Sequence, residues 1–300
     1  MELITELQHG RLRATPLVTS DASSSSMLRK WPHPKANFTN SLCGRPHYNH
    51  WLPPDAQRER IQAVLVSPRN PLNIGAAARA MANFGFERLA VVAPYAPNWR
   101  EARSAVGAPE LLHKAREFST LAEAVEDCTL VAGTGTLARR RPQQQVVPLL
   151  NFAPLVQAEI ERGGRVALVF GPEKHGLTRD NLSHCHLLVE IPANPRQPSI
   201  NLGQAVAICL YELASRTFGG EAQVQEAGVD RGTTTASSGS LDLLADLVGE
   251  VMTAAGYSPT AMQEANRHDV RLLLRRLALT EPDSRRILGL FRRVLRRLRH

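Results

Sequence analysis

The chain has 300 residues, of which 43% are hydrophobic, and its formal net charge is +8. This length allows one large domain, or one domain with appendages, with an ordinary buried core. No apolar run approaches the roughly 18 to 20 residues that span a bilayer, so we expect no membrane partner.

Arginine carries most of the positive charge, because 32 of the 36 basic residues are arginine and four are lysine. The planar guanidinium suits paired phosphate contacts, so this composition favours a polyanionic partner. Codon bias in a GC-rich genome would also explain the choice of arginine.

The four cysteines are widely spaced and form no C-x-x-C pair. Neither a zinc site nor a disulfide framework is therefore predicted, and we expect no metal. The N-terminal sequence lacks the charged and then apolar pattern of a secretion signal. We therefore expect a cytoplasmic protein.

Residues 1–58 contain a serine run and scattered proline, histidine and arginine, without apolar periodicity. They predict a mostly disordered extension. Residues 59–218 have a different pattern, in which short apolar runs alternate with helical stretches. The predicted strands cover 61–67, 88–93, 129–132, 166–170 and 187–191, and the predicted helices cover 74–85, 109–126, 151–162, 178–184 and 201–216. This alternation predicts an open parallel α/β sheet with both faces covered.

A Gly-, Ser- and Thr-rich stretch over residues 219–240 predicts a linker. Beyond it, helical spacing over 241–255, 260–279 and 282–298 predicts a small C-terminal helical module, residues 241–300. Its last two helices contain eleven arginines. No carboxylate stands four residues away from Arg292, Arg293, Arg296, Arg297 or Arg299. A solvated helix face is the plain explanation of such a run, but mutual repulsion favours phosphate binding.

Three loops at strand ends carry the chemically informative residues. The first, after residue 67, enters a helix near Asn73, which we expect to cap that helix, and Arg79 follows on it. The second, Val169–Leu177, fails as a phosphate-binding P-loop, because Gly176 is followed by Leu177 and Thr178 where a P-loop has lysine and then serine or threonine. The third runs from Ile191 through Ser199 and Asn201 into a helix. In open α/β sheets such loops converge on a ligand site, and the Gly133–Thr136 turn would be a fourth.

In order and spacing, these segments resemble the three motifs of the SpoU branch of the SPOUT RNA methyltransferases. Asn73, Gly75 and Arg79 match the first motif, and Phe170–Glu173 with Gly176–Leu177 match the second. Ile191–Pro192 and Ser199–Gly203 match the third. The helical tail further resembles the C-terminal extension of the TrmJ type, which methylates the tRNA anticodon loop.

The resemblance implies a parallel sheet closed by a C-terminal deep trefoil knot, a homodimer, and bound S-adenosyl-L-methionine. The residues carried over as cofactor contacts are Thr134, Gly135, Thr136, Gly171, Ile191, Pro198, Ser199 and Ile200. Relatives often carry serine where this chain has Pro198.

The resemblance also implies 2′-O-methylation of RNA ribose, with Arg79, Asn73, Glu173, Ser199 and Asn201 as catalytic candidates. A guanidinium is a poor base, so we expect Arg79 to grip the phosphate next to the target and orient the hydroxyl. Glu173 and Asn201 would position the sugar or Arg79, and Asn73 and Ser199 would shape the loops.

The expected substrate is a cytidine or uridine at position 32 of the tRNA anticodon loop. Ribosomal RNA or another tRNA site is the alternative with the same chemistry. A non-catalytic RNA-binding protein is the alternative from another class.

Overall fold

The computed structural model describes residues 55–135, 142–217 and 234–299. Most of the expected extension over 1–58 and most of the expected linker over 219–240 lie outside the described residues. At the end of the expected extension, Asp55–Arg58 form the short helix α1. At the end of the expected linker, helix α8, Ser238–Ala254, begins.

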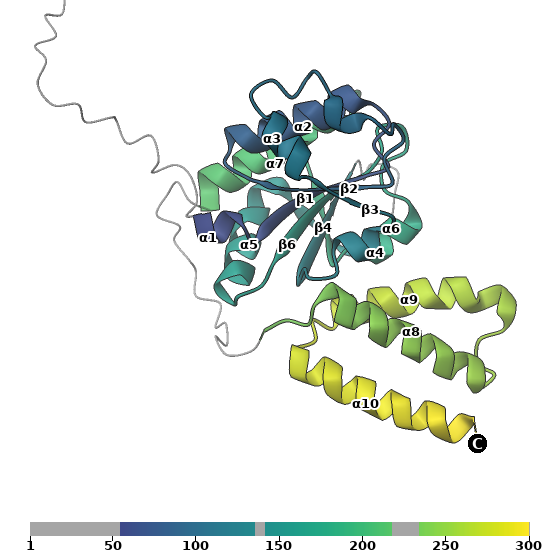
Figure 1. The fold of residues 1–300 in the computed structure, drawn as a ribbon. Coiled ribbons are helices and arrows are strands. Elements are labelled where there is room, and N and C mark those ends of the chain that lie inside the picture. Colours follow the sequence, from purple (N-terminus) through teal and green to yellow (C-terminus); the bar gives the residue numbers. More distant parts are fainter. Residues whose placement is uncertain (1–54, 136–141, 218–233, 300) are drawn as a thin grey trace, which may run out of the picture. The chain divides into compact units, whose positions relative to one another are not determined.

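Seven parallel strands form one sheet in the order β3-β2-β1-β6-β4-β7-β5 (Figure 1). The strands are β1 Ile61–Val66, β2 Arg88–Val92, β3 Arg116–Phe118, β4 Leu130–Thr134, β5 Gln145–Pro148, β6 Val166–Phe170 and β7 Leu187–Glu190. The parallel sheet and its five predicted strands are confirmed, with ends shifted by one or two residues. The strands β3 and β5 were missed. They are the two edge strands, and most of their side chains are exposed, so they lack a long apolar run.

The helix predicted over residues 109–126 is wrong. The segment forms helix α3, Pro109–Lys114, then strand β3, and then the short helix α4, Leu121–Ala124. Thr120 starts α4 with a capping box, in which its hydroxyl accepts from the backbone N–H of Glu123. Because β2 offers a free edge, pairing with β2 overrides the helical preference of the segment between the two helices.

Helices cover both faces of the sheet (Figure 1). The remaining helices of this region are α2 Pro71–Asn83, α5 Phe152–Glu161, α6 Arg179–Ser183 and α7 Leu202–Thr217, with short 3-10 turns at Trp99–Glu101 and Leu149–Asn151. Successive strand residues point to opposite sides: Leu65 packs in one core with α2, α5 and α7, and Val64 packs in the other with α4. Burial on both sides explains why the central strands are continuous apolar runs.

Helices α8, α9 (Gln263–Arg276) and α10 (Glu281–Leu298) pack around a cluster of their own, and a 3-10 turn, Thr260–Met262, precedes α9. Six of the eleven arginines counted above form ion pairs with carboxylates: Arg267, Arg271, Arg275, Arg285, Arg286 and Arg299. Arg299, expected to lack a counter-charge, lies 2.8 Å from Glu250 of α8. In the described ranges, Arg276, Arg292, Arg293, Arg296 and Arg297 form no ion pair.

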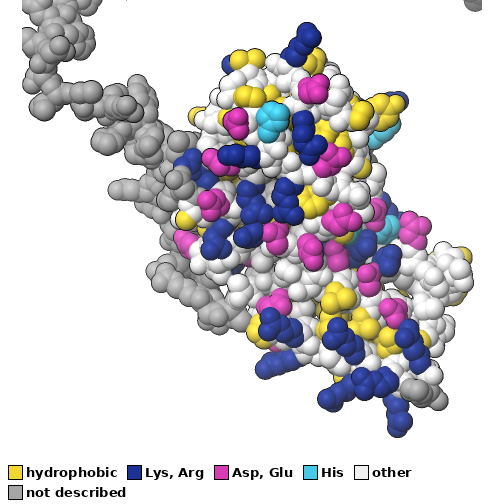
Figure 2. Space-filling model, in the orientation of Figure 1, with side chains coloured by type: hydrophobic (Ala, Val, Ile, Leu, Met, Phe, Trp, Pro, Cys, Tyr) yellow, Lys and Arg dark blue, Asp and Glu magenta, His cyan; other side chains and the backbone are white. Residues whose placement is uncertain are grey.

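Basic side chains nevertheless gather over this part of the surface, around a group of hydrophobic side chains (Figure 2). The exposed hydrophobic residues on α8 and α10 include Leu243, Leu290 and Leu298. None of the described helices is long and apolar enough to cross a membrane.

Candidate functional site

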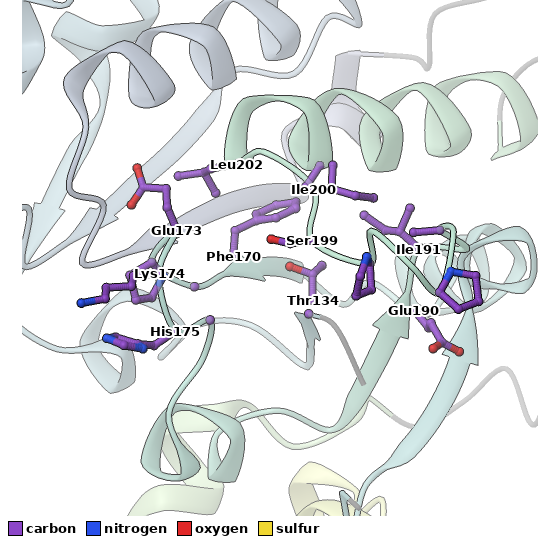
Figure 3. A pocket seen from close by; sticks show the side chains of 18 residues that line it. Thr134, Phe170, Glu173, Lys174, His175, Glu190, Ile191, Ser199, Ile200 and Leu202 are labelled. Carbon is purple, nitrogen blue, oxygen red and sulfur yellow. The ribbon is translucent and has the colours of Figure 1, made fainter. Parts of the chain in front are cut away.

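The carboxyl ends of β4, β6 and β7 open into a pocket of about 370 Å³. Glu173, Lys174 and His175 lie at one end, Glu190 and Ile191 lie at the other, and Ser199 and Thr134 lie between them (Figure 3). Seven of the eight expected cofactor contacts line this pocket: Thr134, Gly135, Gly171, Ile191, Pro198, Ser199 and Ile200. The eighth, Thr136, lies outside the described residues. Three loops that are separate in the sequence, after β4, β6 and β7, therefore line one pocket.

The loop that follows β6 folds back on itself to form one side of the pocket. The Gly176 backbone N–H donates to the Pro172 carbonyl, and Gly176 adopts a φ of +63° that favours glycine. A Cβ at Gly171 would overlap the backbone of Gly176 and Leu177. The buried side chain of Leu177 anchors the loop in the core beneath. The two glycines are therefore required by the shape of the loop.

A chain of hydrogen bonds joins residues from all three motifs beside the pocket. The Asn73 side-chain amide donates to Glu173 Oε1 at 2.8 Å, and the Asn201 amide donates to Asn73 Oδ1 at 2.9 Å. Glu173 also accepts from the backbone N–H groups of Arg69 and Asn70, at 3.1 and 3.2 Å. The carboxylate thus ties the loop after β1 to the loop after β6.

These contacts keep Glu173 ionised. Burial raises the pKa of its carboxyl, but the hydrogen bonds from Asn73 and from the backbone outweigh this, so the pKa lies below its ordinary value. Because both oxygens already accept hydrogen bonds, the side chain is an anchor for the loops. Its remaining lone pairs can still accept from a ligand hydroxyl.

The expectation that Asn73 caps its helix is wrong. Helix α2 begins earlier, at Pro71, and Asn70 is the cap, because its side chain accepts from the Leu72 backbone N–H at 2.9 Å. Asn73 lies in the first turn, where its side chain is free to reach Glu173 and Asn201. Asn201 itself caps α7 by accepting from the Gly203 backbone N–H.

The structure does not bring Arg79 into this pocket. Its side chain is exposed on α2 and is absent from the pocket lining. Within the described ranges it forms no hydrogen bond or ion pair. Ser199 lines the pocket, and Glu173 contacts the motif-one backbone and not Arg79. Of the five catalytic candidates, Glu173 and Ser199 therefore line the pocket. Asn73 and Asn201 are hydrogen-bonded beside it, and Arg79 is exposed elsewhere on α2.

Sequence reasoning did not single out Lys174 and Glu190, whose side chains also line the pocket. Their position beside Glu173 and Ile191 was the only available signal. Phe170, Ile200 and Leu202 supply an apolar wall. In the described part of the chain, no group of three or more His, Cys, Asp or Glu residues could hold a metal ion.

The model of the SpoU rRNA methylase family matches residues 60–211, which is half of the chain and contains every motif above. The chain belongs to this family. It is 41% identical over 156 residues to the tRNA (cytidine/uridine/adenosine-2′-O-)-methyltransferase TrmJ of Pseudomonas aeruginosa (strain UCBPP-PA14), covering 52% of this chain and 60% of that protein. The alignments with this relative and two others span 60, 63 and 64% of their lengths.

Two further relatives align over a larger share of the chain. The tRNA (cytidine/uridine-2′-O-)-methyltransferase TrmJ of Sodalis glossinidius (strain morsitans) is 31% identical over 241 residues, covering 80% of this chain and 91% of that one. The crystal structure of TrmJ from Z. mobilis ZM4 superposes with a TM-score of 0.66 at 30% identity, covering 78% and 98% of the two chains. The likeness thus extends beyond the half of the chain matched by the family model.

Proposed function

We propose that this SpoU methylase transfers a methyl group from S-adenosylmethionine to a ribose 2′-hydroxyl of tRNA in the cytoplasm. The expected target is a cytidine or uridine at position 32 of the anticodon loop. The observation that carries the proposal is the convergence of all three motifs on the Asn73, Glu173 and Asn201 network beside one pocket. The names of the relatives, which specify tRNA 2′-O-methylation, support the choice of substrate.

The pocket fits S-adenosylmethionine in size and in chemistry. Its volume lies within the range of small-ligand sites, and it combines an apolar wall with loop backbone groups that can bond an adenine and an amino acid. When bound, the cofactor supplies a methyl group on a sulfonium, which an oxygen nucleophile can attack in line. The side chains Phe170, Ile200 and Leu202 would exclude water around it, and Ser199 would orient it.

The protein's remaining task is to place the hydroxyl so that its oxygen attacks the methyl carbon while its proton passes to water. Glu173 holds the two motif loops at a fixed spacing, and Asn201 holds the third through Asn73. In the proposed mechanism Arg79 grips the phosphate next to the target ribose and so orients the 2′-oxygen. A free-standing arginine suits this task, because its guanidinium keeps all its donors for the RNA.

Because Arg79 faces away from its own pocket, we propose that it serves the pocket of a second subunit. Leu72, Ala76, Arg79 and Asn83 follow helical spacing along α2, and Gln204, Ile208, Tyr211 and Ser215 do so along α7. The two helices pack together, and Ile208 and Tyr211 are 39% and 57% exposed. A two-fold dimer through this face would bury these side chains and place Arg79 of each subunit beside the pocket of the other.

The finer organisation is also a proposal. We propose a methyltransferase domain over residues 59–218 whose C-terminal segment passes through a loop to form a trefoil knot. Insertion of β7 between β4 and β5 supports this. After a linker over 219–240, residues 241–300 would act as a basic module that binds RNA phosphates. The exposed, unpaired arginines of α10 support that role.

Incubation with labelled S-adenosylmethionine and unmodified tRNA transcripts tests the function. Nuclease digestion and mass spectrometry should place a 2′-O-methyl group in the anticodon loop. Methylation of ribosomal RNA and not of tRNA would show that the proposed substrate is wrong. Failure to bind S-adenosylmethionine would favour a non-catalytic RNA-binding protein.

Replacing Gly171 by alanine should weaken cofactor binding. The new Cβ would overlap backbone atoms of Gly176 and Leu177, which cannot move without opening the loop. Calorimetric titration with S-adenosylmethionine should show at least about tenfold weaker binding, as expected for a displaced pocket wall. Gly249→Ala on α8 is the control, because a Cβ there meets nothing within 4 Å. Unchanged binding by Gly171→Ala would remove this loop from the cofactor site.

A further inference from the structure

An exposed aromatic residue stands beside the motif-one loop. Tyr95 follows β2 and is 73% exposed. The guanidinium carbon of Arg69 lies over its ring, 5.0 Å from the centroid. Arg69 is also the residue whose backbone N–H donates to Glu173 Oε2. The pair therefore sits at the edge of the site without lining the pocket itself.

A strained backbone residue stands shortly before each member of the pair in the chain. In the described ranges only three residues other than glycine have a positive φ, and two of them are Ser67 at 45° and Ala93 at 43°. Each directly follows one of two neighbouring strands, β1 or β2, and each stands two residues before a member of the pair. The Tyr95 backbone N–H donates to the Pro68 carbonyl at 3.1 Å and ties the two loops together. Such conformations cost free energy, and they cluster where function requires a fixed geometry.

One face of the Tyr95 ring thus carries a guanidinium, while most of the side chain remains open. Unpaired RNA bases are recognised mainly by stacking on aromatic rings and on arginine planes, whereas bases in a duplex are stacked already. A cation already held on one face leaves the other face of the ring for a base.

We propose that Arg69 and Tyr95 form a stacking platform for an unpaired base next to the target nucleotide. This rests on the proposed function and adds to it. The platform makes a single-stranded loop, and not a helix, the RNA element that the site reads. A base stacked there lies beside the Glu173 loop, so the adjacent ribose is directed toward the pocket.

The test compares Tyr95→Leu with Tyr95→Phe on unmodified tRNA transcripts. Loss of the ring should raise the KM for tRNA about tenfold, leave the KM for S-adenosylmethionine unchanged, and be rescued by phenylalanine. Tyr95→Phe is the matched control, because it keeps the ring and removes only the hydroxyl. Equal KM values for Tyr95→Leu and wild type, or equal losses for leucine and phenylalanine, would overturn the platform.

A binding measurement separates this proposal from the proposed function. The probes are anticodon stem-loops that carry 2-aminopurine at successive loop positions. The wild-type protein should quench the 2-aminopurine fluorescence at one of these positions, and Tyr95→Leu should not. If that quench appears while no RNA is methylated, the platform stands and the activity is wrong. If methylation occurs without any Tyr95-dependent quench, the platform is wrong and the activity stands.

Discussion

Arg79→Lys is expected to lower kcat for tRNA methylation about 10² to 10³-fold, because a single ammonium cannot reproduce the paired hydrogen bonds of the guanidinium. Binding of S-adenosylmethionine should be unchanged, since Arg79 does not line its own pocket. Single-turnover kinetics at saturating RNA measure the effect. Arg165→Lys is the control, because Arg165 is 43% exposed, pairs with Asp127 and precedes β6 at the amino ends of the strands, opposite the pocket. Full turnover by Arg79→Lys would refute the phosphate clamp.

Mixed dimers determine which subunit's pocket Arg79 serves. One subunit would carry Arg79→Ala and the other Gly171→Ala, with different affinity tags so that only mixed dimers are purified. If Arg79 acts on the partner's pocket, one of the two sites is intact and about half of the wild-type activity returns. If it acts on its own pocket, both sites are damaged and no activity returns.

Asp242→Asn is expected to lower the free energy of unfolding by about 3 to 5 kcal/mol, because it leaves a buried guanidinium without its counter-charge. Asp242 lies 2.9 Å from Arg275, whose side chain is 1% exposed and also donates to the His184 carbonyl. Asp246→Asn is a matched control one turn along α8. Its pair with Arg267 is about half exposed and should contribute under about 1 kcal/mol. Urea denaturation with hydrogen exchange on α9 measures both, and equal effects would contradict the prediction.

The same aspartate should make stability depend on pH. Burial raises the pKa of its carboxyl, but hydrogen bonds and charge from His184 and Arg275 lower it further, from 3.8 to about 2. The folded pKa is depressed, so the stabilisation is fully present above 3.8 and is lost as pH falls toward 2. It amounts to about 2 kcal/mol. Asp242→Asn should remove this part of the pH dependence.

The sequence by itself determined the central strands and the loops that carry the motifs. Strands buried on both faces must be apolar throughout, and that run is visible locally, as in Val166–Phe170. The resemblance of the motifs to the SpoU methylases named the seven pocket residues, and the strand ends that meet at one edge of a parallel sheet explain why these residues lie together.

Only the tertiary structure decided where the edge strands form, what Asn73 binds, and which arginines of the C-terminal helical module form ion pairs. The strand β3 forms because it can pair with the edge of β2. Asn73 does not cap its helix, and its side chain instead donates to Glu173, 100 residues away in the sequence. Arg275, counted with the RNA-binding charges, is buried against Asp242 and holds the helices α8 and α9 to the end of α6. Each of these outcomes depends on a partner distant in sequence, and local pattern contains no information about which partner a side chain will meet.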